Sequence, residues 1–129
     1  MKVVLVNSVG IDGAGNYIIH SPSRWTEATI NKENCFVYYP WQLAYLSSLL
    51  KKNTAHSVKL IDGCLLGADC NRLAERISRE APDIVIFESG TRVFNDNLHV
   101  ALEVKKNSGA VVVFVGQHAS AWPDAVIRA

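Results

Sequence analysis

An unbroken apolar run stands between a proline and a glycine in Pro82-Asp83-Ile84-Val85-Ile86-Phe87-Glu88-Ser89-Gly90. A strand with one solvated face alternates apolar and polar residues, and this run does not alternate. Runs of this kind are typical of a parallel sheet that is covered by helices on both faces. Similar runs occur at Val3 to Val6, Val58 to Ile61 and Ala110 to Val115. Together the four runs predict four parallel strands.

Segments with helical periodicity separate these runs. The first places leucines at positions 43, 46, 49 and 50, and Pro40 suits its first turn because a missing N–H costs little there. The second ends before Pro82, since proline forbids continuation of a helix. The predicted helices cover Tyr39 to Asn53, about Arg72 to Ala81, and about Asn95 to Asn107. This alternation predicts a flavodoxin-like, Rossmann-like α/β domain with a doubly wound parallel sheet and three layers, α/β/α.

The connection after the first strand, residues 8–39, is far longer than the usual 2 to 6 residues. It contains glycines, His20 and Trp25, a mixture that is able to wrap a polar ligand and to stack on a flat one. Long loops of this kind are more often functional than idle. The alternative is a partly disordered insertion.

The end of the sequence also differs from the pattern of a doubly wound domain. After Gly116-Gln117-His118 the chain reaches Trp122-Pro123 and stops as a helix begins. Domains of this type commonly have five strands. We therefore expect a truncated last strand, and we expect residues 1–129 to be the N-terminal part of a longer protein.

Composition limits the classes of partner. With 129 residues, 49% apolar and 19% charged, the chain is sized for one core. The net charge is +1 and neither sign forms a block, which predicts no binding to nucleic acid or to a membrane. Three cysteines at irregular spacing argue against a secreted disulfide framework. No apolar run has the length of a signal peptide or of a membrane span, so we expect a cytoplasmic protein.

Five segments in order carry a family resemblance: Lys2 to Asn7, Tyr39 to Leu46, Val58 to Asp62, Pro82 to Ile86, and Val115 to Ser120. In this order they resemble the N-terminal cobalamin-binding (vitamin B12-binding) domain of radical S-adenosylmethionine (radical SAM) enzymes. The subgroup that is most similar is the anaerobic magnesium-protoporphyrin IX monomethyl ester oxidative cyclase type. The resemblance implies that cobalamin binds above the carboxyl ends of the strands.

By position, the resemblance assigns cofactor contacts to three turns. Glycine lets a ligand approach the backbone, and helix N-termini favour phosphate, so the residue types agree with the assignment. Cover for the corrin ring would come from Tyr17, Trp25, Phe36 or Tyr38. The implied cofactor-binding residues are Asn7, Ser8, Val9 and Gly10 after the first strand, Glu88, Ser89, Gly90 and Thr91 after the third, and Gly116, Gln117 and His118 after the fourth.

The chain departs from the family pattern at two places. None of its four histidines stands in the Asp-x-His-x-x-Gly motif that supplies a cobalt ligand, and Gln117 replaces the second glycine of a usual Gly-Gly pair. A glutamine side chain at this position is able to block the channel for the nucleotide tail. His118 is as well suited to capping a strand-to-helix turn as to lining a pocket.

Catalytic motifs are absent from the sequence. The Cys-x-x-x-Cys-x-x-Cys motif of a radical enzyme does not occur, so an iron–sulfur cluster and S-adenosylmethionine would belong to a downstream radical SAM domain. Cys64 and Cys70 are expected to be packed residues, and Glu88 lacks a paired carboxylate or nucleophile.

We therefore expect no catalytic and no metal-ligating residues in this domain, which would present a corrinoid to a separate catalytic core of cyclase or methyltransferase type. Two alternatives stay open: a degenerate domain of the same fold that serves as a docking module, and a nucleotide or flavin binder.

Overall fold

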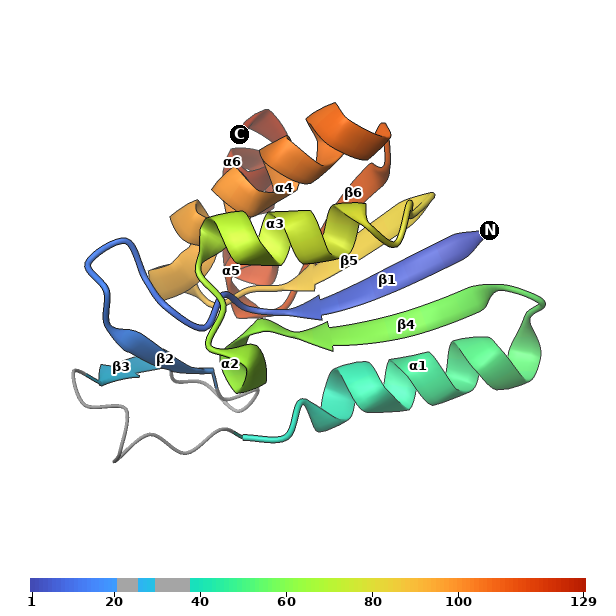
Figure 1. The fold of residues 1–129 in the computed structure, drawn as a ribbon, viewed down its shortest axis with the longest axis horizontal. Coiled ribbons are helices and arrows are strands. Elements are labelled where there is room, and N and C mark those ends of the chain that lie inside the picture. Colours follow the sequence, from blue (N-terminus) through green and yellow to red (C-terminus); the bar gives the residue numbers. More distant parts are fainter. Residues whose placement is uncertain (21–25, 30–37) are drawn as a thin grey trace.

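A four-stranded parallel sheet forms the centre of the molecule in the computed structural model, which describes residues 1–20, 26–29 and 38–129. The spatial order of its strands is β4-β1-β5-β6 (Figure 1). Each strand coincides with one of the four apolar runs, so the predicted parallel sheet is confirmed. The bounds are Lys2–Asn7 for β1, Ser57–Asp62 for β4, Ile84–Glu88 for β5 and Val111–Val115 for β6.

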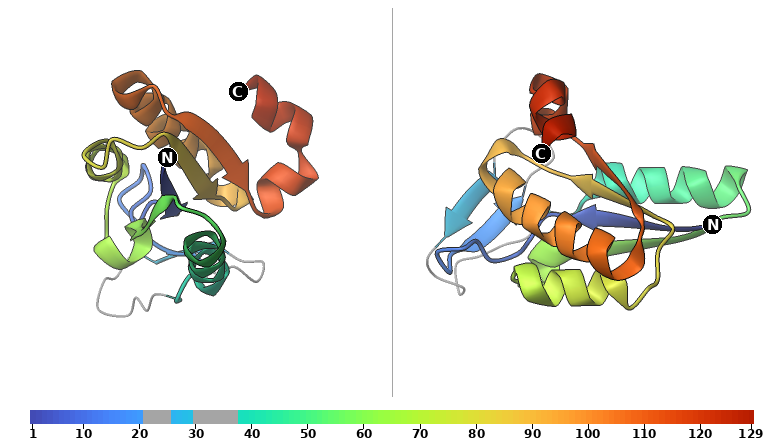
Figure 2. Two further views of the ribbon diagram at one scale, coloured as in Figure 1. Left: turned by 90° about the vertical axis from the view of Figure 1, so that its right-hand side faces the viewer. Right: turned by 90° about the horizontal axis from the view of Figure 1, so that it is seen from above.

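Helices cover both faces of this sheet, as the end-on view in Figure 2 shows. Helix α1 (Trp41–Asn53) packs on β4 and β1, where Leu43 joins Val3, Leu5 and Val58 in one apolar cluster. On the opposite face, α3 (Cys70–Ser78) and α4 (Phe94–Ser108) lie side by side over a larger cluster. This arrangement is the predicted three-layer, flavodoxin-like fold.

The crossovers of the chain lie on both faces of the sheet, and their order reverses between β1 and β5. From β1 the chain passes to α1 on one face, whereas from β5 it passes to α4 on the other. β1 and β5 are neighbours, so the order of the crossovers reverses between them, although the connection after β1 first passes Val9 and the hairpin on the side of α3 and α4. Ligands of doubly wound proteins bind at such a switch point.

The connection of residues 8–39 differs from the expected loop. It contains an antiparallel hairpin, in which β2 (Tyr17–His20) pairs with β3 (Thr26–Thr29). Ile18 of β2 is 1% exposed and belongs to the cluster beneath α3 and α4. The hairpin contacts α2 (Gly63–Leu66) through β2 (Figure 1). It contacts the 3-10 turn η2 (Thr91–Val93) through β3. This part of the connection is therefore packed structure, which the short and weakly periodic strand sequences do not reveal.

Two short helices follow β6. They are α5 (Gln117–Ala121) and α6 (Pro123–Arg128); α6 agrees with the helix expected to begin near Trp122-Pro123, whereas α5 was not expected. In the described residues β6 has a strand on one side only, and Val111 and Val113 are 61% and 37% exposed. A groove of about 440 Å³ lies between α4, β6 and α6.

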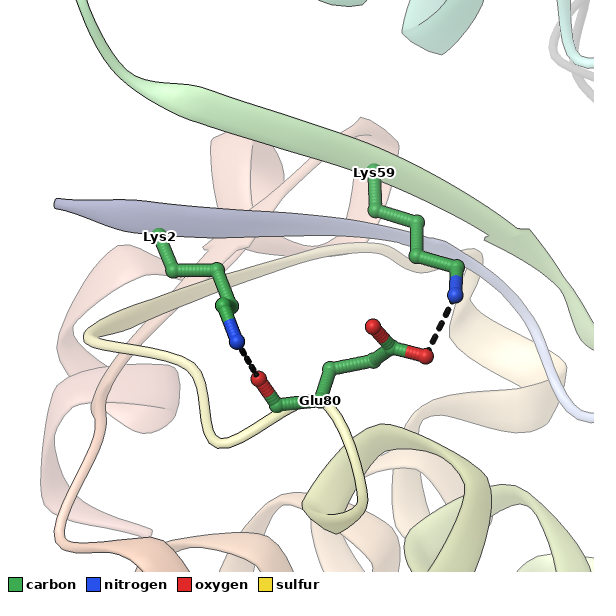
Figure 3. A network of polar contacts seen from close by, with 3 residues as sticks. All are labelled: Lys2, Lys59 and Glu80. Carbon is green, nitrogen blue, oxygen red and sulfur yellow. Dashed lines mark hydrogen bonds and ion pairs between the residues drawn. The ribbon is translucent and has the colours of Figure 1, made fainter.

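Polar contacts join β1, β4 and the turn after α3 near the amino ends of the strands, opposite the carboxyl ends. Glu80 follows α3; its carboxylate accepts a hydrogen bond from Lys59 Nζ of β4, and its carbonyl oxygen accepts one from Lys2 Nζ of β1 at 2.5 Å (Figure 3). The hydrogen bond from Lys59 lowers the pKa of Glu80.

No helix within the described residues has the length and apolar character that crossing a bilayer requires.

Candidate functional site

Polar residues and glycines gather at the carboxyl edge of the sheet. We call this region the carboxyl rim and define it by Asp62, residues 7–10, residues 88–91 and residues 116–118. The parallel register places Asn7 beside Asp62 and Glu88 beside Val115. All three turns that the sequence singled out therefore lie along one edge.

The β5 and β6 turns are joined by backbone hydrogen bonds. Ser89 N donates to the carbonyl oxygen of Val115 at 3.0 Å, and His118 N donates to that of Ser89 at 3.4 Å. Gly116, with φ +98°, links the two, and a Cβ atom there would lie 3.1 Å from the Ser89 carbonyl oxygen. Only glycine adopts this conformation without strain. A glycine at position 116 therefore allows the β5 and β6 turns to approach each other closely.

Asn97, which the sequence analysis missed, connects the β1 turn to the β5 turn. Its side chain on α4 is fully buried. Asn97 Nδ2 donates to Ser89 Oγ at 3.0 Å and to Ser8 Oγ at 3.2 Å, and Asn97 Oδ1 accepts from Val9 N at 3.2 Å. The hydroxyl groups of Ser8 and Ser89 thus serve the fold, since they are buried and paired inside the protein.

The β1 turn is packed beneath the hairpin and α2. Gly10 N donates to the Ala68 carbonyl oxygen at 2.7 Å, and the Gly10 carbonyl oxygen accepts from Ile18 N at 3.0 Å. A Cβ atom on Gly10 would lie 2.2 Å from the carbonyl oxygen of Gly63. Val9 and Gly10 are both buried, so their contribution is to position the rim, and the Gly10 N–H is not available to a ligand.

His118 lies against η2 and the start of α4. Its ring stacks on Phe94 with centroids 4.2 Å apart, and His118 Nδ1 lies 3.2 Å from Thr91 Oγ1. This contact unites two predicted site residues from different turns. Thr91 and Gln117 are exposed, whereas Gly90 and His118 are half-buried. Together with the half-buried Asp62 and Gly116, these four residues form the accessible part of the rim.

Glu88 occupies the switch point between β1 and β5. Its side chain is 6% exposed, and Glu88 Oε2 has no hydrogen-bond partner among the described residues. Burial raises the pKa of this carboxyl group, because a charge without a partner is poorly solvated there. Glu88 therefore favours its neutral form more than an exposed glutamate does.

The neighbouring polar residues of the rim already have partners. Asn7 Nδ2 donates to Asp62 Oδ1 at 3.0 Å, and Asn7 Oδ1 accepts from Ser8 N at 3.1 Å. Asp62 also caps α2, since its Oδ1 accepts from Leu65 N at 3.0 Å. Among the buried side chains of this row, Glu88 is thus the one with an unpartnered oxygen in the described structure.

The aromatic residues proposed as a cover have different placements. Tyr17 is half-buried beside α2, and Tyr38 is 44% exposed just before α1. Trp25 and Phe36 lie outside the described residues. An aromatic cover for the corrin ring therefore stays a prediction.

The described cysteines do not form a site for a metal ion. Cys64 is buried in α2, and Cys70 is the first residue of α3. Burial and the nearby carboxylates of Asp96 and Asp69 raise the pKa of Cys70 to about 11, which disfavours the thiolate. In the described ranges no group of three or more His, Cys, Asp or Glu side chains is arranged to hold a metal.

Comparison with known proteins associates the chain with a methyltransferase. Over 104 residues, or 80% of its length, it is 32% identical to an uncharacterized methyltransferase from Pyrococcus horikoshii. The match covers 22% of that protein, so the chain spans about a fifth of the length of its relative. No protein-family model and no solved structure matches the chain. The similarity is compatible with a methyltransferase-associated domain.

Proposed function

We propose that this chain is a cobalamin-binding domain that presents a corrinoid to the radical SAM catalytic core of a methyltransferase-type protein. One observation carries the proposal: three turns meet at the switch-point edge of a parallel sheet, where a buried carboxyl oxygen has no partner among the residues that the structure describes. The family resemblance of the strand and turn segments supplies the identity of the ligand.

The residues of the rim have different parts in this proposal. Gly90, Thr91, Gln117 and His118 would contact the corrinoid directly, because their side chains or backbone reach the surface. Asn7 to Gly10 would hold the rim in shape. The domain itself performs no chemical step, and its role is to bind and orient the cofactor.

Methyl transfer is favoured over ring cyclisation by the relative, which is described as a methyltransferase. A bound corrinoid supplies a cobalt centre that is able to carry a methyl group. Iron–sulfur and S-adenosylmethionine chemistry would reside in a downstream radical SAM domain, which would be the protein partner.

A spectroscopic titration tests this proposal. Hydroxocobalamin is added to the purified protein, and the corrinoid absorption bands are followed to saturation. We expect a saturable shift, which Thr91→Trp weakens because Thr91 is exposed on the rim. Thr54→Trp is the matched control, since Thr54 is an exposed threonine at the amino edge of the sheet. Absence of a shift with the unaltered protein would reject corrinoid binding.

A docking module without cofactor is the second candidate. The observation that favours it is the β1 turn, whose backbone groups pair with Ala68 and with the hairpin. Gln117→Gly separates the two candidates, because a rim that the glutamine side chain obstructs would gain corrinoid affinity from this change. If the unaltered chain and Gln117→Gly both fail to bind, the docking role is preferred.

A further inference from the structure

We propose that the buried carboxyl group of Glu88, whose Oε2 has no partner among the described residues, pairs with a primary carboxamide of the bound ligand at the carboxyl ends of β1 and β5. Corrinoids carry primary carboxamide side chains on the ring, so this inference rests on the proposed function and specifies one contact within it.

Alternation along β5 sets that direction. Val85 and Phe87 belong to the cluster beneath α3 and α4, whereas Ile86 packs against the cluster beneath α1. Since successive side chains of a strand point to opposite faces, Glu88 shares the α1 face with Ile86. It therefore points away from the hairpin, which packs on the cluster of the other face through Ile18.

An unpartnered oxygen in this position calls for an explanation, because nearly all buried polar atoms in proteins have a hydrogen-bond partner. The flanking strands offer no hydrogen-bond partner to this oxygen. The side chain of Asn7 already pairs with Asp62 and with Ser8 N, and the adjacent positions of β6 are Val115 and then Gly116, which have no polar side chain. A Cβ atom on Gly116 would lie in ordinary van der Waals contact with Glu88 Cγ, at 3.5 Å, so Gly116 lies beside the stem of Glu88 and adds no polar group there.

Burial, and not a neighbouring charge, favours the neutral form of Glu88. Burial alone raises its pKa. On the elements packed nearby, Asp62 of β4 pairs with Asn7 and Leu65 N, His118 of α5 faces Thr91 and Phe94, and the first turn of α1 contains no acidic residue. In the described structure no cation pairs with Glu88. A neutral carboxyl group has one donor and one acceptor, and these complement the two groups of a primary carboxamide.

The test compares wild type, Glu88→Gln and Glu88→Ala in titrations with hydroxocobalamin between pH 5 and pH 8. Glutamine keeps a donor and an acceptor, so we expect its dissociation constant to stay within about threefold of the wild-type value at pH 5, and Glu88→Ala to lose about tenfold or more. Wild-type affinity should fall as pH rises, whereas that of Glu88→Gln should stay constant. Glu75→Gln, an exposed change on α3, is the control.

Infrared spectroscopy provides a second measurement on the unaltered protein, which matters if Glu88→Ala does not fold. The carbonyl band of a protonated carboxyl group should shift when hydroxocobalamin binds, and this band should be missing from Glu88→Gln.

Each contrary result has a distinct meaning. Equal affinities of wild type and Glu88→Ala at every pH, with no band shift, would overturn the pairing and leave corrinoid binding intact. Wild-type affinity that rises with pH would overturn it in favour of an ionised carboxylate. No binding by wild type would overturn the pairing together with the proposed function.

Discussion

Asn97 holds three buried polar groups in place, namely the hydroxyl groups of Ser8 and Ser89 and the N–H of Val9. Asn97→Ala leaves these groups without partners inside the protein, so we expect the free energy of unfolding to fall by about 2 to 4 kcal/mol. Urea denaturation measures the change as a lower midpoint with an unaltered slope. Asn95→Ala, an exposed change on the same helix, should have little effect. Equal midpoints for the two variants would show that the Asn97 contacts are dispensable.

Two glycines near the rim should respond differently to alanine. At Gly10 an added Cβ would lie 2.2 Å from the carbonyl oxygen of Gly63, whereas at Gly13 the nearest atom, Asp96 Oδ1, would lie 3.7 Å away. Backbone atoms do not move aside easily, so we expect Gly10→Ala to cost about 3 kcal/mol or more. Gly13→Ala should change stability by less than about 1 kcal/mol. Thermal unfolding of the two variants checks the difference, and similar melting temperatures would contradict the packing of the β1 turn.

The raised pKa of Glu88 predicts how stability depends on pH. Its ordinary value is 4.5, and burial raises it in the folded state. Below pH 4.5 both states hold the proton. As pH rises, the unfolded state releases the proton first. The contribution of Glu88 to the free energy of unfolding therefore falls until the pH exceeds the raised pKa of the folded state. The stability of wild type relative to Glu88→Gln should therefore decline above pH 4.5 and then level off. A constant difference across this range would mean that the pKa is not raised.

At the scale of elements, the sequence predicts the central strands well and the hairpin poorly. The central strands β1 and β5 consist mostly of apolar, β-branched residues, as burial on both faces requires. The outer strands β4 and β6 keep part of this pattern but expose Lys59, Val111 and Val113. By contrast, β2 and β3 have four residues each, and they are stabilised by long-range contacts such as that of Ile18 with the core. Such contacts have no local signature in the sequence.

Helix faces were predicted less accurately than helix positions. Leu49 fits the leucine pattern of α1, yet it is 49% exposed, and Ser47 is buried in its stead. Leu102 of α4 is 51% exposed, whereas Asn97 is fully buried. Hydrophobicity alone does not identify a buried asparagine, because its burial depends on partners from other elements.

For the carboxyl rim, too, the sequence predicts what depends on strand topology and misses what depends on long-range contacts. Topology alone predicts that the turns after β1, β5 and β6 share one edge, since carboxyl ends of parallel strands lie together. The sequence does not show that the Gly10 N–H is already paired with Ala68. Both partners of the Gly10 backbone, Ala68 and Ile18, are set by the folded structure, and the β1 turn is the least accessible of the three turns although it contains a glycine.

At the scale of the whole molecule, β6 forms an edge of the described sheet that lacks the usual protection. It consists of five apolar residues without a charge or a proline, and Val111 and Val113 are exposed. Edge strands of this kind promote association. We expect concentration-dependent self-association of this chain, which the double variant Val111→Lys/Val113→Lys should reduce without a large loss of stability. Sedimentation velocity measures both proteins, and identical behaviour would exclude the β6 edge as the contact.

The central claim is that a corrinoid binds at the carboxyl rim, and hydrogen–deuterium exchange with and without saturating hydroxocobalamin tests it most directly. We predict slower exchange in peptides that contain residues 88–92 and 116–119, and unchanged exchange in residues 54–57 and 80–83 at the amino edge. Unchanged exchange at the rim, or protection confined to the amino edge, would contradict the account.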